Sequence, residues 1–227
     1  MMMSAICGIL FDLDNTLLDH EAAAKQAFIS WAAEMAIDPN STNMQHWSAA
    51  ERKFPPTPQR GVTMSTTRAY RMQEFLSAAT DGPPTAEHEE LIAHYGRYLE
   101  HYERSWNLYR DVLGSVARLR RQFRIGLLTN GASELQRRKL EKTGLDTLFD
   151  AIVVSEEIEC AKPAADAFAI ACRLLRLDPR TVLYVGDDSR IDIDGAIGAG
   201  LQAELIERQG TGGDTVLHEL TNRLLSI

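Results

Sequence analysis

Residues 5–16 carry the sequence AICGILFDLDNT, in which an apolar run stops abruptly at two aspartates, Asp12 and Asp14. Three other short apolar runs end in the same way: residues 124–128 before Thr129-Asn130-Gly131, residues 151–154 before Ser155-Glu156-Glu157, and residues 181–185 before Gly186-Asp187-Asp188. Apolar runs without alternation are typical of strands buried on both faces of a parallel sheet. The four runs therefore predict four such strands, each with polar residues at its carboxyl end.

Helical patterns separate these strands. Residues 112–119 repeat apolar side chains at helical spacing, residues 135–145 frame a second helix that Gly144 is expected to end, and residues 164–175 follow Pro163 as a third. This alternation predicts an α/β fold, a Rossmann-like core with a parallel sheet. Ligands of such sheets bind at the carboxyl ends of the strands, which is where these polar residues stand.

One long segment breaks the alternation. Residues 18–106 contain no convincing buried strand, but helices are predicted at 21–37, 43–54, 64–79 and 87–106, separated by proline-containing turns. The helical spacing of Tyr95, Tyr98 and Tyr102 predicts that these rings pack inside the segment. We therefore predict an all-helical cap, residues 18–106, inserted after the first strand of a core formed by residues 1–17 and 107–227.

Composition limits the classes of partner. The 227 residues include 24 lysines and arginines against 32 aspartates and glutamates, a net charge of −8. This charge repels nucleic acids and anionic membranes, so we expect neither as a partner. A cytoplasmic location is favoured by three features of the sequence. Its three cysteines lack metal-ligand spacing, it shows no basic leader, and no apolar run approaches the ~18 residues of a membrane span. The sequence leaves open a monomer or a small homo-oligomer.

The aspartates at the strand ends indicate a cation site. Asp12 and Asp14 are two residues apart, so an extended chain points both side chains to one face, and Asp187 is expected to join them from another strand end. Two carboxylates about 4 Å apart repel by roughly 4 kcal/mol at an effective dielectric constant of about 20. Lys162 and a divalent cation are the candidates to offset this repulsion, and oxygen ligands without histidine or cysteine suit Mg²⁺.

These residues, in this order, resemble the four motifs of the haloacid dehalogenase (HAD) superfamily. The motifs are Asp12-Leu13-Asp14-Asn15-Thr16, then Thr129-Asn130-Gly131, then Lys162-Pro163 with Phe168, and finally Gly186-Asp187 with Asp192, Gly195 and Ala196. The insert occupies the position of the type-1 helical cap. The segment 129–163 is similar to the branch that holds N-acylneuraminate-9-phosphatases and pyrimidine 5′-nucleotidases. Two positions depart from the usual motif, Asp188 in place of serine or threonine and Ile191 in place of asparagine.

The resemblance implies a Mg²⁺-dependent phosphatase that hydrolyses a small phosphomonoester, a nucleoside monophosphate or a sugar phosphate, through an aspartyl-phosphate. Asp12 would be the nucleophile and Asp14 the general acid and base. Mg²⁺ would lie among the Asp12 carboxylate, the Asp14 backbone carbonyl and the Asp187 carboxylate. The phosphoryl oxygens would be held by Thr129, the Asn130 backbone N–H and Lys162, while Asp192 would orient the lysine or a metal-bound water.

Three alternatives stay open. A phosphomutase would return the phosphoryl group to a bound sugar. A metal-free 2-haloacid dehalogenase attacks carbon and lacks the second aspartate, so the presence of Asp14 favours phosphoryl transfer. A non-catalytic binding protein on the same fold would be expected to have lost at least one catalytic group, whereas Asp12, Asp14, Thr129, Lys162 and Asp187 are all present.

Selectivity among phosphomonoesters is expected to come from the insert, because the core motifs contact only the phosphoryl group. The candidate contacts are His20 and Arg60, with Arg68 and Arg71 as further cations, although a solvated position is the simpler interpretation of each. Asp188 and Asp194 are expected to act as helix caps and first-turn acids.

Overall fold

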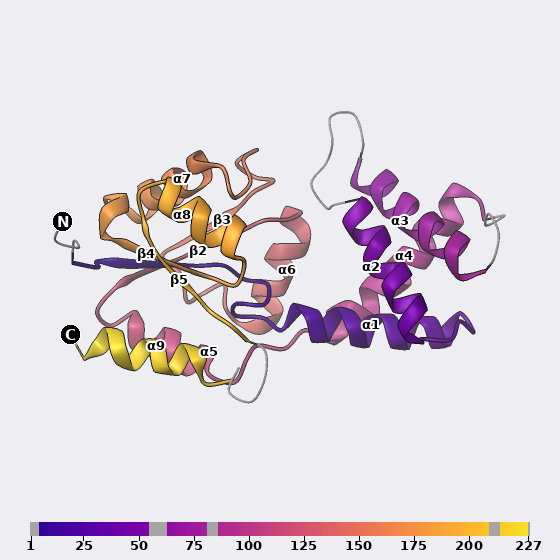
Figure 1. Cartoon of the computed structure of the whole chain (residues 1–227), viewed down its shortest axis with the longest axis horizontal. Coiled ribbons are helices and arrows are strands. Elements are labelled where there is room, and N and C mark those ends of the chain that lie inside the picture. Colours follow the sequence, from indigo (N-terminus) through magenta and orange to yellow (C-terminus); the bar gives the residue numbers. More distant parts are fainter. Residues whose placement is uncertain (1–4, 55–62, 81–85, 209–213, 227) are drawn as a thin grey trace. The chain divides into compact units, whose positions relative to one another are not determined.

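The computed structural model describes residues 5–54, 63–80, 86–208 and 214–226. Within these residues one sheet has the order β3-β2-β1-β4-β5, and all neighbouring strands are parallel. The strands are β1 (Gly8–Phe11), β2 (Arg124–Thr129), β3 (Ala151–Val154), β4 (Val182–Gly186) and β5 (Gln202–Leu205). The α/β fold with a parallel sheet is therefore confirmed (Figure 1).

Helices alternate with these strands along the chain. They are α5 (Val112–Leu119), α6 (Ser133–Thr143), α7 (Ala165–Leu175), the short 3-10 helix Pro179–Thr181, the π-helix Ser189–Asp194, α8 (Gly195–Gly198) and α9 (Val216–Leu225). Gly144 ends α6 in the left-handed conformation, with φ of 71°, as its sequence position predicts.

The register of the sheet brings the functional strand ends together. β1 lies at the centre, and its last residue Phe11 pairs with Leu127 of β2 and with Val185 of β4. The Asp12 N–H then donates to the Val185 carbonyl at 2.9 Å, so the pairing continues one residue beyond β1. Because the strands are parallel, the residues that follow them meet at one edge of the sheet.

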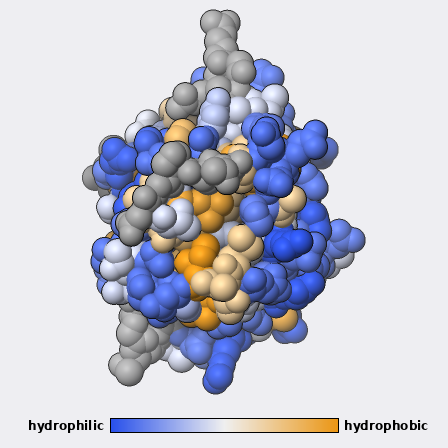
Figure 2. Space-filling view, turned by 90° about the vertical axis from the view of Figure 1, so that its right-hand side faces the viewer, coloured by the Kyte–Doolittle hydropathy of each residue, from blue (hydrophilic) through white to orange (hydrophobic). Residues whose placement is uncertain are grey.

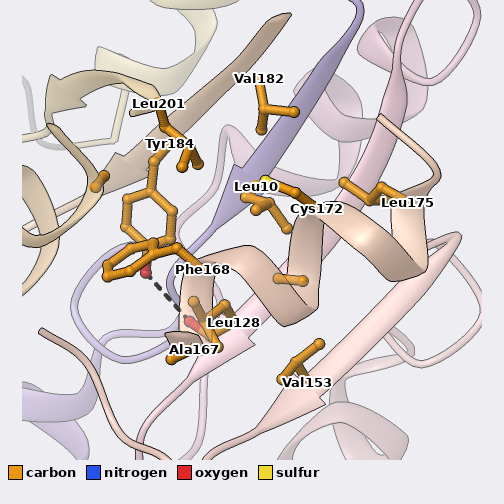
Figure 3. Packing of buried hydrophobic residues seen from close by; sticks show 12 residues of the cluster. Leu10, Leu128, Val153, Ala167, Phe168, Cys172, Leu175, Val182, Tyr184 and Leu201 are labelled. Carbon is orange, nitrogen blue, oxygen red and sulfur yellow. Dashed lines mark hydrogen bonds between the residues drawn. The ribbon is translucent and has the colours of Figure 1, made fainter. Parts of the chain in front are cut away.

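The core beside this edge is packed closely against α7. Phe168 and Leu175 of α7 join Leu10, Leu128 and Tyr184 of the sheet in one buried cluster (Figure 3). The rings of Phe168 and Tyr184 meet edge to face with centroids 5.1 Å apart. The Tyr184 hydroxyl lies 3.2 Å from the Leu128 carbonyl, to which it can donate, so this polar atom is satisfied inside an apolar core.

The described residues fall into two compact units. One comprises the residues up to His20 and from Asn107 onward, and the other is Glu21–Trp106. The second unit contains α1 (His20–Glu34) apart from its first residue, and also α2 (Ser41–Lys53), α3 (Met64–Ala79) and α4 (His88–Arg104). These helices agree with the predicted ranges to within three residues at each end.

Aromatic rings fill the interior of the helical unit. The rings of Trp47 and Tyr98 have centroids 4.4 Å apart, and Trp31 meets Phe75 edge to face at 5.5 Å. The three tyrosines of α4 are buried, with exposed fractions of 5% for Tyr95, 2% for Tyr98 and 3% for Tyr102. Their predicted packing in the core of the insert is confirmed.

The apolar-run criterion misses β5. This strand has the sequence Gln202-Ala203-Glu204-Leu205 and lies at one edge of the sheet, where its residues are half-buried or exposed. An edge strand has one unpaired side and less apolar burial, so polar residues are tolerated there. Strand formation at this position depends on pairing with β4 and not on local hydrophobicity.

The surface is mostly hydrophilic on the face that Figure 2 shows, where apolar residues gather near the centre. In the part of the chain that the structure describes, no helix combines the length and apolarity needed to cross a membrane. Leu113 and Leu174 are about half exposed, at 50% and 53%, which is ordinary for isolated apolar side chains.

Candidate active site

The predicted site residues meet at the carboxyl edge of the sheet. Asp12 and Asp14 follow β1, Thr129 ends β2, and Asp187 follows β4. Lys162 comes from the segment between β3 and α7, and Asp192 comes from the π-helix after β4. Asp12, Thr129, Lys162 and Asp192 are buried, whereas Asp14 and Asp187 are partly exposed.

Lys162 lies at the centre of this group. Its ammonium nitrogen is 2.5 Å from Asp12 Oδ1, 2.7 Å from Asp192 Oδ1 and 2.8 Å from the Tyr184 hydroxyl, so three acceptors surround its three N–H groups. Burial by itself would lower the pKa of the Lys162 ammonium, but the charges of Asp12 and Asp192 outweigh burial and raise the pKa above its ordinary value. Lys162 is therefore a fixed positive charge beside Asp12.

The carboxylates are crowded enough to call for a cation. Oxygens of Asp12, Asp187 and Asp192 lie within 4.8 Å of one another. Burial raises the pKa of Asp12 to about 7 against the lowering effect of Lys162, and burial together with the Asp192 charge raises the pKa of Asp187 to about 6. A divalent cation would stabilise their charged forms, and the all-oxygen donor set fits Mg²⁺. The residues present therefore fit the predicted metal.

Asp192 is already engaged by the protein. Its Oδ1 accepts from Lys162 and lies 3.1 Å from the Tyr184 hydroxyl, and its Oδ2 accepts from the Asp188 backbone N–H at 3.1 Å. Because these partners occupy both of its oxygens, we expect Asp192 to orient Lys162 and not to bind the metal directly. Asp188 itself caps the π-helix, since its Oδ1 accepts from the backbone N–H groups of Arg190 and Ile191.

Asp14 is bound by two residues that the sequence patterns do not predict. Both carboxylate oxygens lie 2.7 Å from the Lys139 ammonium, and Oδ2 lies 3.1 Å from Gln136 Nε2. Burial would raise the pKa of Asp14, but Lys139, with contributions from His20 and Gln136, holds the pKa below its usual value. A sign of this role exists in α6, where Gln136 and Lys139 occupy inward positions that apolar residues would otherwise fill.

The second motif is held in place from both sides. Gln136 donates to the Thr129 hydroxyl at 2.6 Å. The Asn130 side chain exchanges two hydrogen bonds with the backbone of Lys162: its Nδ2 donates to the Lys162 carbonyl at 3.0 Å, and its Oδ1 accepts from the Lys162 N–H at 2.9 Å. The Asn130 side chain thus joins the second motif to the third.

The candidates for substrate selection have different outcomes. Arg60 lies outside the described residues. Arg71 is buried inside the helical unit, where it donates to the Phe54 carbonyl at 2.5 Å and to the Tyr95 hydroxyl at 2.9 Å. The Arg68 guanidinium lies over the Tyr95 ring, 5.9 Å from its centroid. The charge of His20 contributes to the lowered pKa of Asp14.

A family model for haloacid dehalogenase-like hydrolases matches residues 6–200. The chain belongs to this family. The match spans the ends of β1, β2, β3 and β4, so the residues that meet at the edge of the sheet lie within the family's domain.

Curated relatives of the chain are phosphatases. The N-acylneuraminate-9-phosphatase of Rattus norvegicus is 29% identical over 216 residues, covering 89% of this chain and 83% of that protein. The ribulose-1,5-bisphosphate 5-phosphatase of Halopiger xanaduensis is 31% identical, with 88% and 84% covered. The pyrimidine 5′-nucleotidase YjjG of Escherichia coli is 29% identical, with 85% and 82% covered. The chain is therefore a HAD-like hydrolase whose relatives support a phosphoric monoester hydrolase.

Solved structures share the fold. The HAD-hydrolase YfnB of Bacillus subtilis, bound to magnesium, is 24% identical with a TM-score of 0.79. The match covers 98% of this chain and 100% of YfnB. The defluorinating L-2-haloacid dehalogenase Rha0230 is 18% identical with a TM-score of 0.73, covering 97% and 95%. Because a phosphate-free chemistry occurs on the same fold, the fold does not decide the reaction.

Proposed function

We propose that this chain is a Mg²⁺-dependent phosphatase that hydrolyses small phosphomonoesters through an aspartyl-phosphate on Asp12. The observation that carries the proposal is the pairing of two aspartates after β1. Asp12 lies against Lys162, and Asp14 lies two residues further on, held by Lys139. A nucleophile and a separate acid and base are what phosphoryl transfer to and from a carboxylate requires.

In the first step a carboxylate oxygen of Asp12 attacks the phosphorus, and the bond from phosphorus to the ester oxygen breaks. Asp14, which is ionised in the free protein, takes up a proton from the solvent as the substrate binds and gives that proton to the departing oxygen. In the second step Asp14 takes a proton from a water molecule, whose oxygen attacks the phosphorus as the bond to Asp12 breaks. Inorganic phosphate leaves, Asp14 releases the proton to the solvent, and both aspartates return to their starting states.

Three groups of the chain would hold the phosphoryl oxygens. Thr129 offers its hydroxyl, Asn130 its backbone N–H, and Lys162 a positive charge where negative charge grows in the transition state. Asp192 and Tyr184 keep the Lys162 ammonium beside Asp12. Mg²⁺, held by the carboxylates of Asp12 and Asp187 and the Asp14 backbone carbonyl, would reduce the repulsion between the nucleophile and the phosphate.

The substrate class is a nucleoside monophosphate or a sugar phosphate. The relatives named above act on a phosphorylated sugar acid, a sugar bisphosphate and a pyrimidine nucleotide. All three kinds of substrate present a small phosphomonoester to the same core motifs. The helical insert is the part of the chain that would distinguish their leaving groups.

A phosphate-release assay over a panel of these esters, with Mg²⁺ and with EDTA, tests the proposal. We expect turnover that requires Mg²⁺ and that Asp12→Asn abolishes, because an amide is a poor nucleophile. More than about a tenth of the wild-type rate in the variant, a barrier change under about 1.4 kcal/mol, would show that Asp12 is not the nucleophile. Halide release from a 2-haloacid without metal, or transfer of phosphate to a sugar without release, would point to the dehalogenase or phosphomutase alternatives.

A further inference from the structure

Two polar residues occupy the buried face of α6. Gln136 and Lys139 each have an exposed fraction of 2%, whereas Arg137 and Arg138 between them face solvent. Residues three apart on a helix share one face, so the two side chains reach the same place. A buried ammonium is unfavourable unless a partner neutralises it, and the fold therefore needs a partner for Lys139.

That partner is the side chain of Asp14. The Lys139 ammonium lies 2.7 Å from both carboxylate oxygens, although the two residues are 125 positions apart in the chain. The Asp14 side chain has an exposed fraction of 26%, so it is held from the inside by Lys139 and still reaches solvent on its other side. This geometry fixes the direction in which the carboxylate points.

Gln136 connects the same carboxylate to the second motif. Its Nε2 lies 3.1 Å from Asp14 Oδ2, 2.6 Å from Thr129 Oγ1 and 3.3 Å from the Asn130 carbonyl. A carboxylate and a carbonyl accept only, so the amide nitrogen must face them. Since the Thr129 oxygen accepts from Gln136, its own proton is directed to another acceptor, and a phosphoryl oxygen is such an acceptor.

We propose that Lys139 and Gln136 are positioning residues for proton transfer: they hold Asp14 against the leaving oxygen of the substrate and aim the Thr129 hydroxyl at the phosphoryl group. The inference rests on the proposed phosphatase function. In the transfer step the proton that Asp14 has taken up from the solvent on substrate binding moves to the departing oxygen, and Lys139 keeps all its protons. Neither residue touches the reacting atoms in this scheme.

The decisive measurement is kcat/KM for esters with different leaving groups, in Lys139→Met. This constant reports only the steps up to departure of the leaving group. An alkoxide needs a proton to leave, whereas p-nitrophenolate does not. We expect kcat/KM for an alkyl phosphomonoester to fall at least about a hundredfold, and kcat/KM for p-nitrophenyl phosphate to fall less than about threefold.

Two further variants separate positioning from stability. Lys139→Arg keeps a charged donor for both oxygens, so it should recover at least part of the alkyl-ester activity. Lys142→Met removes a solvent-exposed lysine from the same helix and should leave both esters unaffected. The thermal unfolding midpoint of each variant identifies any that fails to fold.

Gln136→Leu tests the second half of the inference. It should raise KM for both esters, because the Thr129 hydroxyl loses its orientation, and should add a loss in kcat/KM specific to the alkyl ester. Equal losses on the two esters in a folded Lys139→Met, or an alkyl-ester rate that matches or exceeds wild type, would overturn the inference. A wild-type protein without phosphatase activity on any ester would instead overturn the proposed function.

Discussion

Asp12→Asn should stabilise the metal-free protein at alkaline pH while it abolishes catalysis. Burial raises the pKa of Asp12 from 3.8 to about 7, against the lowering effect of Lys162. A raised carboxyl pKa means that the folded state resists ionisation of Asp12. The carboxyl therefore contributes to stability at a pH below its pKa in the unfolded chain, and this contribution is lost as the pH rises through its pKa in the folded protein. An uncharged asparagine removes this loss.

The size of the effect follows from the two pKa values. At pH 8 the full shift of roughly three pKa units applies, so the free energy of unfolding of Asp12→Asn should exceed that of wild type by up to about 4 kcal/mol. At pH 5 the folded carboxyl is protonated and the unfolded one is mostly ionised, so the gain shrinks to about 2 kcal/mol. Mg²⁺ should reverse the order at pH 8, because it stabilises the charged wild-type site and finds one ligand fewer in the variant.

Thermal and urea unfolding of both proteins, after metal removal, measure these differences at pH 5 and pH 8. For a chain of this length a change of 1 kcal/mol moves the midpoint by roughly 2–4 °C, so the expected difference is well resolved. A variant less stable than wild type at pH 8 without metal, or a gain that grows on acidification, would refute the electrostatic reasoning.

Three other perturbations test separate parts of the molecule: the metal ligands, the support of Lys162 and a buried ion pair. EDTA should remove activity, and added Mg²⁺ should restore it. Mg²⁺ should also raise the thermal unfolding midpoint of the wild-type protein more than that of Asp187→Asn. An equal rise in both proteins would exclude Asp187 as a metal ligand. Gly186→Ala should lower kcat by at least about tenfold, since a Cβ there would lie 2.4 Å from Asp192 Oδ2 and displace the residue that orients Lys162; an unchanged kcat would contradict that role. Arg208→Met should lower the free energy of urea unfolding by about 3 kcal/mol, because it breaks the 2.9 Å ion pair between Arg208 and Asp111, two side chains that are each 3% exposed. A loss below about 1 kcal/mol would contradict a stabilising role for this ion pair.

The sequence alone determines the strands around the site and the polar residues that follow them. β3 (Ala151–Val154) and α3 (Met64–Ala79) have the bounds that hydrophobic patterns predict. The reason is physical: a central parallel strand must be apolar on both faces, so its end is marked by the first polar residue. The pattern of apolar runs is therefore sufficient to assign Asp12 and Thr129 to one edge of a sheet.

Tertiary structure decides which side chains support those residues. Lys139 meets Asp14 across 125 positions, and the Tyr184 hydroxyl meets Lys162 across 22. Local periodicity records that a helix or strand forms, but it does not record which buried polar group faces which. The edge strand β5 depends on β4 in the same way. Pairing between distant segments is set by the packing of the whole core, because a buried charge is tolerated only where the fold supplies its partner.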